Sequence, residues 1–169
     1  MEQSKRCRDS LVVKTSIVLP PDTNSHGTMF GGKLMAYIDD VAAISAMRHA
    51  RSPVVTASTD SVDFLHPIFE GDAVCLESFV TYTGRTSMEV FVKVVAEKLL
   101  TGERNVCAIS FLTMVAVNKN GQPIPVPKVL PETDLEKELH ETAKKRSEIR
   151  KHRKKENEEM VQNFASRLP

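Results

Sequence analysis

The sequence predicts an α+β fold, in which an antiparallel sheet curls around one long helix and a charged helix follows at the C-terminus. Three observations favour it: one long helical segment that is apolar on nearly every side, four long β-type runs joined by short turns, and a C-terminal stretch rich in Glu, Lys and Arg. The 169 residues leave room for one domain of ordinary size and a tail.

The first predicted strand covers residues 11–19. Alternate positions place mostly apolar side chains on one face, as in a half-buried strand: Leu11, Val13, Thr15, Ile17 and Leu19. Pro20 and Pro21 end this strand, because proline has no N–H group for the ladder.

The predicted helix runs from residue 31 to about residue 51, since Pro53 bars its continuation. One stripe of this helix is apolar or small: Leu34, Ile38, Val41, Ala42 and Ser45. Similar residues extend to its other sides: Met35, Ala36, Ala43 and Ala46. A helix of this kind is normally buried, so we expect the strands to surround it.

The four runs that follow cover residues 54–66, 73–83, 87–98 and 105–117. Their connections are short and turn-like, which favours antiparallel pairing, because a parallel crossover needs a dozen or more residues. Together with the first strand they predict the order β-α-β-β-β-β.

The tail begins after a turn at residues 118–121 and a proline-rich exit. Thr133 and Glu136 have the spacing of a capping box, which predicts a charged helix over residues 132–166. Three interpretations of this helix remain open: light packing on a neighbouring subunit, contact of the basic residues 144–155 with RNA or a membrane, and partial disorder. We therefore divide the chain into an extension (1–10), a domain (11–128) and a tail (129–169).

Composition excludes several classes of protein. No apolar run approaches the roughly 20 residues of a membrane span, and no apolar stretch follows the basic N-terminus as in a secretory signal. Residues 1–130 carry 13 basic and 13 acidic side chains, which argues against nucleic-acid binding there. Three widely spaced cysteines fit neither a disulfide framework nor a zinc site, so we expect a cytoplasmic protein.

The segment from Asn24 to Gly32 is the most informative, because three glycines lead directly into the predicted helix. A helix start leaves backbone N–H groups unpaired and carries partial positive charge, so it could stabilise a carbonyl oxygen that becomes negative during acyl transfer. The alternative, that the glycines only turn the chain, stays open at this point.

Asp39 and Asp40 follow on the same helix. Asp39 lies at the rim of the apolar stripe, where a carboxylate is costly unless it is paired or reactive, and is the better candidate for a base or nucleophile. Asp40 points away from the stripe, which favours a salt bridge or a subunit contact. Either carboxylate could instead cap a neighbouring element.

Two longer stretches carry a resemblance: N-S-H-G-T-M-F-G-G-K-L-M-A-Y-I-D at residues 24–39 and V-V-T-A-S-T-D-S-V-D-F-L-H-P-I-F-E-G-D at residues 54–72. With the order of elements, they resemble the hotdog-fold acyl-CoA thioesterases, in particular the bacterial and cytosolic acyl-CoA hydrolases. The resemblance covers about residues 8–128. It implies an acyl-CoA substrate, a dimer with a continuous sheet and a homohexamer built as a trimer of dimers.

The resemblance also implies roles for single residues. Asn24 and Asp39 match the catalytic pair, contributed by opposite subunits, with Asp39 either activating water or attacking the thioester directly. The N–H groups around Gly31 and Gly32 would hold the oxyanion, and Thr56 and Ser58 could bind the pantetheine arm. The turn near coenzyme A (CoA) matches four residues: Gly84, Arg85, Thr86 and Ser87. We expect no metal and no organic cofactor.

We interpret the histidines, and two of the cysteines, as structural or surface residues. His26 departs from close bacterial relatives and could act as a base, but we interpret it as a residue that shapes its loop, and His66 as structural. We expect three histidines on the surface: His49, His140 and His152. Cys75 and Cys107 are interpreted as core residues within strands.

Two other function classes compete with a thioesterase. A non-catalytic acyl-CoA sensor would explain the basic stretch, but both matched polar residues are present. A hydratase or dehydratase, which the fold also hosts, would need a histidine and an acid on the helix, but its only histidine, His49, lies at the far end from Asp39. We expect acyl-CoA hydrolysis, with no membrane insertion and no nucleic-acid partner.

Overall fold

The computed structural model describes residues 4–167, so the first three residues of the predicted extension and the last two of the tail lie outside it. It contains two α-helices and seven strands in that range: β1 (Ser4–Arg6), β2 (Val12–Ile17), α1 (Gly31–Ala50), β3 (Val54–Phe64), β4 (Ala73–Thr83), β5 (Ser87–Lys98), β6 (Glu103–Ala116), β7 (Lys128–Leu130) and α2 (Asp134–Ala165). The predicted fold class is confirmed, and the bounds of β4 and β5 agree with the predicted runs.

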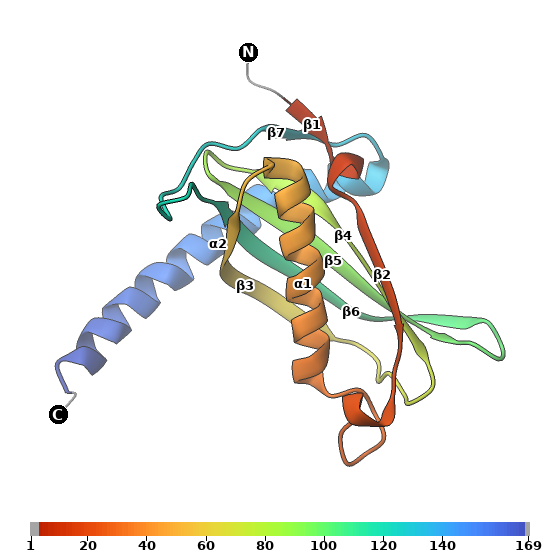
Figure 1. Ribbon diagram of the computed structural model, residues 1–169. Helices are drawn as coiled ribbons and strands as arrows, with labels where there is room; N and C mark the ends of the chain where they lie inside the picture. Colours follow the sequence, from red (N-terminus) through yellow and green to blue (C-terminus); the bar gives the residue numbers. More distant parts are fainter. Residues whose placement is uncertain (1–3, 168–169) are drawn as a thin grey trace.

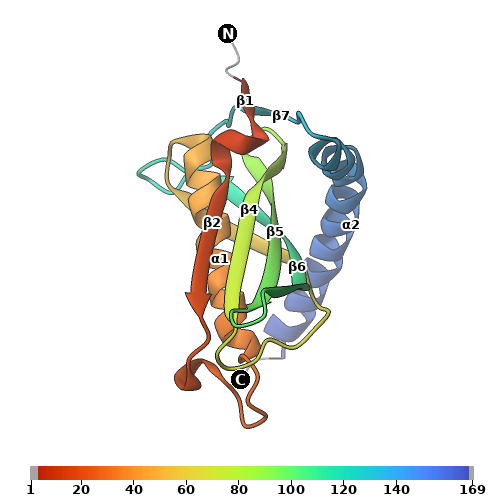
Figure 2. The same cartoon turned by 90° about the vertical axis from the view of Figure 1, so that its right-hand side faces the viewer.

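Five strands form one antiparallel sheet in the order β2-β4-β5-β6-β3 (Figure 1). β2 and β3 are therefore its edges in the single chain. Helices α1 and α2 lie on opposite faces of this sheet (Figure 2). The short strands β1 and β7, which the sequence did not predict, pair in parallel and bring residues 4–6 beside the segment that leads into α2.

Helix α1 buries one side against the sheet. Leu34, Ile38 and Val41 are almost fully buried, and each such side chain contributes on the order of 1.5–3 kcal/mol by leaving water. The opposite side is not covered: Met35 and Met47 are 48% and 42% exposed. The expectation that strands surround the helix is therefore met on one side only, because five strands of one chain cover only part of its circumference.

Helix α2 packs along the outer face of the sheet of its own chain. Arg146 donates two hydrogen bonds to the buried Glu89 on β5, at 3.0 and 2.8 Å, and stacks on the ring of Phe111 on β6. Further along, Arg150 and Arg153 pair with Asp60 on β3, at 3.6 and 2.7 Å. This half of α2 is therefore fixed to its own sheet, because these three arginines recur at helical spacing and face acidic groups of the sheet. Packing of α2 on a neighbouring subunit stays a prediction.

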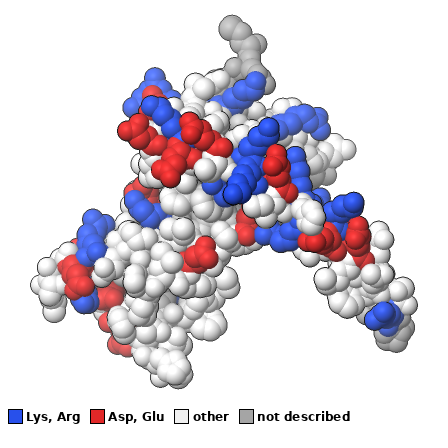
Figure 3. Space-filling model, turned by 180° about the vertical axis from the view of Figure 1, so that it is seen from behind, with Lys and Arg blue, Asp and Glu red and all other residues white. Residues whose placement is uncertain are grey.

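The start and the far end of α2 differ in character. The predicted capping box is present: Glu136 N donates to Thr133 Oγ1 at 3.2 Å, and Thr133 N donates to Glu136 Oε2 at 3.0 Å. The last turns project beyond the sheet, with Lys, Arg, Asp and Glu intermixed along the helix (Figure 3). Charged side chains therefore dominate α2, as its composition predicted.

Of the histidines expected on the surface, His49 is fully buried and His140 is half-buried. His49 at the end of α1 is fully buried, and its Nε2 lies 2.9 Å from the carbonyl oxygen of Pro127. The Nδ1 of His140 lies 2.8 Å from the carbonyl oxygen of Thr81. Both carbonyl groups are distant in sequence, so the surface prediction was wrong for His49 and only partly right for His140 for a reason that only the folded chain reveals. His152 is exposed as expected.

We predict that Arg146→Gln lowers the free energy of unfolding by about 3 kcal/mol, because Glu89 would remain as a buried charge without its partner. Urea denaturation measures this change. The matched control is Arg104→Gln, which removes an exposed pair with Glu97 at 3.3 Å and should cost less than about 1 kcal/mol. Equal losses would show that the buried pair does not anchor α2.

Burial lowers the pKa of His49 in the folded protein, although its hydrogen bond to Pro127 acts in the opposite direction. The unfolded chain therefore binds more protons just below the ordinary pKa of about 6.5, and the free energy of unfolding should fall between pH 7 and pH 5. We predict that His49→Gln makes this fall smaller, as measured by urea denaturation at both pH values. His152→Gln should keep the wild-type slope; an unchanged slope in His49→Gln would contradict the prediction.

Candidate active site

Asn24 organises the loop that precedes α1. Its Oδ1 accepts a hydrogen bond from the backbone N–H of His26 at 2.9 Å, and its Nδ2 donates to Thr28 Oγ1 at 2.9 Å. Gly27 supports this tight turn with a φ of +72°, a conformation that favours glycine. His26 therefore shapes the loop through its backbone.

Gly31 and Gly32 open helix α1. Residues at these positions have N–H groups without an intrahelical acceptor, and no side chain caps this helix start. A Cβ atom on Gly32 would lie 2.5 Å from the ring of Phe30, so a larger residue would require that ring to move. Gly31 also borders an apolar cavity of about 340 Å³, whose lining includes Leu34 and Phe64. The unpaired N–H groups at the start of α1 thus lie next to an apolar cavity.

Asp39 lies in the middle of α1 and is exposed in the single chain. The hydroxyl of Thr56 on β3 donates a hydrogen bond to Asp39 Oδ1 at 2.7 Å. Asp40, by contrast, forms a salt bridge with Lys14 on β2 at 3.1 Å. The two neighbouring carboxylates therefore contact strands at opposite edges of the sheet, Asp39 at β3 and Asp40 at β2. The predicted salt bridge of Asp40 is present.

The structure brings only some of the predicted site residues together. Among the described residues, no hydrogen bond joins Asn24 to Asp39. Thr56 and Ser58 are separated by an irregularity in the β3–β6 pairing. Ser58 contacts α2 instead of α1, accepting a hydrogen bond from Arg153 at 2.9 Å, so the two hydroxyls lie on opposite faces of the sheet.

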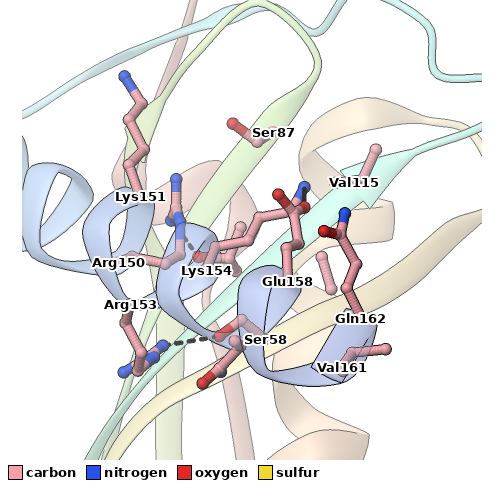
Figure 4. Close-up of a pocket in the computed structure, with 13 residues that line it drawn as sticks. Ser58, Ser87, Val115, Arg150, Lys151, Arg153, Lys154, Glu158, Val161 and Gln162 are labelled. Carbon is pink, nitrogen blue, oxygen red and sulfur yellow. Dashed lines mark hydrogen bonds and ion pairs between the residues drawn. The ribbon is translucent and has the colours of Figure 1, made fainter. Parts of the chain in front are cut away.

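The residues Gly84 to Ser87 form a tight turn between β4 and β5, closed by a hydrogen bond from Gly84 N to the carbonyl oxygen of Ser87 at 2.8 Å. The carbonyl oxygens of Arg85 and Thr86 accept further backbone hydrogen bonds from distant segments. Ser87 also lines a cavity of about 730 Å³ between the sheet and α2, together with Ser58 (Figure 4). Sequence reasoning missed this contact of α2 with the turn, because nothing local indicates where the tail docks.

The cysteines are poor candidates for a catalytic nucleophile. Burial, with a smaller contribution from Glu136, raises the pKa of Cys7 to about 12, and burial also raises the pKa of Cys107. Cys107 is a core residue as predicted, whereas Cys75 on β4 is only half-buried. Neither a cluster of three potential metal ligands nor a helix that could cross a membrane occurs among residues 4–167.

Comparison with known proteins agrees with these features. Residues 26–103 match the model of the thioesterase superfamily. The chain is 56% identical to the uncharacterized acyl-CoA thioester hydrolase YkhA of Bacillus subtilis, covering 99% of this chain and 97% of that protein. It is 38% identical to the cytosolic acyl coenzyme A thioester hydrolase of Rattus norvegicus, but spans only 35% of the length of that protein.

Two solved structures are similar over most of their length. A hexameric acyl-CoA thioesterase without ligand superposes with a TM-score of 0.88 at 59% identity, covering 89% of this chain and 97% of that one. The acyl-CoA hydrolase of Staphylococcus aureus, in complex with butyryl-CoA, CoA and CoA disulfide, gives a TM-score of 0.92 at 46% identity, with coverages of 96% and 99%. The chain therefore belongs to the acyl-CoA thioester hydrolases of the hotdog-fold thioesterase superfamily.

Proposed function

We propose that the protein hydrolyses acyl-CoA thioesters to a free acid and CoA, with Asp39 as base or nucleophile. The observation that carries this proposal is the hydrogen bond from Thr56 to Asp39, at 2.7 Å. It occupies Oδ1 and leaves Oδ2 available to a water molecule or a carbonyl carbon. The carboxylate is exposed in the single chain, at the edge of the side of α1 that its own sheet leaves uncovered.

In the general-base route, Asp39 takes a proton from water as the water oxygen attacks the thioester carbonyl. The N–H groups of Gly31 and Gly32 stabilise the oxygen that becomes negative. Collapse of the tetrahedral intermediate breaks the C–S bond, and the leaving thiolate takes up a proton to give CoA. In the nucleophilic route, Asp39 attacks the carbonyl carbon, the C–S bond breaks and the CoA thiolate leaves and takes up a proton; water then hydrolyses the mixed anhydride to the free acid and regenerates the Asp39 carboxylate. Both routes use the same residues.

We further propose that Asn24 reaches this site from a second subunit. In support, Asn24 and Asp39 share no hydrogen bond within the described chain, β3 is an edge strand, and α1 exposes Met35 and Met47 on the side that the sheet does not cover. A second copy that paired along β3 would extend the sheet and cover this apolar side. Hexameric relatives support a hexamer as the larger assembly, which we propose to be a trimer of such dimers.

Variants of the Staphylococcus aureus enzyme also support these roles. Structures of that hydrolase carry alanine in place of an asparagine, an aspartate or a threonine, at positions 15 and then 17 residues apart. Asn24, Asp39 and Thr56 have the same residue types and the same separations here. These residues supply the chemistry without a metal or an organic cofactor. A cytoplasmic location stays a prediction.

We expect Asp39→Asn to lower the turnover number for acyl-CoA at least a hundredfold, because an amide can neither take a proton nor attack a carbonyl. Asp40→Asn should retain most activity, since Asp40 is paired with Lys14 at the other edge of the sheet. Release of thiol from a series of short to long acyl-CoAs measures both. Equal losses in the two variants would refute the role of Asp39.

The shared site is tested by mixing subunits. Asn24→Ala and Asp39→Ala proteins should each be inactive, but a dimer containing one of each has one intact composite site. We predict that unfolding and refolding the mixture restores part of the activity, with mixed dimers verified by native mass spectrometry. If verified mixed dimers stay inactive, the two residues do not act across an interface.

A further inference from the structure

Strand β3 is irregular at the point where it contacts both helices. In a regular strand, side chains two residues apart point to the same face. The pairing of β3 with β6 shifts between Thr56 and Ser58, which leaves Ala57 as an extra residue without a partner, and it shifts again at Asp60. Each shift is a β-bulge. The first bulge explains why Thr56 faces α1 whereas Ser58 faces α2.

The hydrogen bond from Thr56 to Asp39 depends on this first bulge. Without it, one of the two flanking segments, residues 54–56 or residues 58–64, would have to slip by one residue against β6. A slip of one residue turns every side chain of the segment to the other face. Residues 54–56 are the shorter segment and slip more easily, and their slip would turn the Thr56 hydroxyl away from Asp39.

Arg153 of α2 holds the bulged segment from the face opposite to Asp39 (Figure 4). Its guanidinium group donates to Ser58 Oγ at 2.9 Å, to Asp60 Oδ1 at 2.7 Å and to the carbonyl oxygen of Asp60 at 2.9 Å. The hydroxyl of Ser58 donates to the same carboxylate oxygen at 2.6 Å. One side chain of α2 thus binds both the residue after the first bulge and the extra residue of the second.

The other carboxylate oxygen of Asp60 ties the bulges to the neighbouring strand. Thr113 on β6, the partner of Ser58 in the sheet, donates to Asp60 Oδ2 at 2.7 Å, and Arg150 lies 3.6 Å from the same oxygen. The Asp60 side chain is only 11% exposed. All of these contacts lie within one chain, among α2, β3 and β6. The planar guanidinium of Arg153 presents several donors in a fixed geometry, which no shorter side chain reproduces.

We propose that Arg153 is a positioning residue for acyl-CoA hydrolysis, a role that rests on the proposed function. Through Ser58 and Asp60 it fixes the bulge that directs the Thr56 hydroxyl to Asp39. Within residues 4–167, no hydrogen bond joins Arg153 to Thr56 or to Asp39, so it acts through the shape of β3. The charged helix thereby contributes to the reaction, although it lies outside the residues that match the thioesterase superfamily.

The first experiment compares Arg153→Gln with Arg146→Gln, by thiol release at a temperature where both proteins are folded. Each variant removes one guanidinium group that ties α2 to the sheet, but Arg146 pairs with Glu89 on β5 instead of with β3. Arg153→Gln should lower kcat at least about tenfold and change KM less than about threefold, because the substrate contacts remain. Arg146→Gln should keep kcat within about twofold, although it removes the more deeply buried pair. Equal losses of kcat would overturn the role of Arg153.

A double-mutant cycle tests whether Arg153 acts through Thr56. Thr56→Val removes the hydroxyl that binds Asp39, so Arg153→Gln should then change kcat less than about twofold in this background. A role of Arg153 in general stability would instead give losses that multiply, and this result would contradict the proposal. If Arg153→Gln does not fold, Asp60→Asn replaces it with the same expectations, because it weakens the same network from the side of β3.

Crystal structures of the wild type and the variant test the coupling without turnover. In Arg153→Gln, the distance from Thr56 Oγ1 to Asp39 Oδ1 should exceed the limit of about 3.5 Å for a hydrogen bond. A variant that keeps this bond overturns the inference. If the wild type hydrolyses no acyl-CoA but the variant loses the bond, the proposed function is refuted and the coupling of Arg153 to Thr56 is retained.

Discussion

The burial of one side of α1 against the sheet is the constraint on which the rest of the structure depends. Leu34, Ile38 and Val41 must face the strands, and a helix that is fixed in rotation also fixes every other side chain on it. Asp39 is thereby directed to the β3 edge, where Thr56 meets it, and Asp40 to the β2 edge, where Lys14 meets it. The difference between two adjacent carboxylates is a consequence of core packing.

Ion pairs between α2 and the sheet form a second set of stabilising interactions. The outer face of the sheet buries Glu89 and nearly buries Asp60, and the arginines of α2 neutralise both. These ion pairs attach α2 to the domain, although a helix so rich in charged residues would be solvated on its own. Three of the basic residues that could have suggested contact with RNA, Arg146, Arg150 and Arg153, are instead used within the chain, which weakens the sensor hypothesis.

Local patterns made much of the fold predictable. The bounds of β4 and β5, the start of α1 at Gly31 and the capping box at Thr133 follow from alternation, glycine placement and spacing, which are properties of neighbouring residues. The strands β1 and β7 escaped prediction, because each is three residues long and is stable only beside the other. His49 and His140 were misplaced because their acceptors, Pro127 and Thr81, are distant in sequence.

The sequence by itself determined the element order, the glycine-rich entrance to α1 and the identity of Asn24 and Asp39 as candidates. Only the tertiary structure decided that Thr56 binds Asp39 whereas Ser58 turns to the other face, and that α2 closes a groove beside the Gly84–Ser87 turn. The physical reason is that periodicity specifies which face of an element is apolar, but the partner of each polar group depends on how elements far apart in the chain pack together.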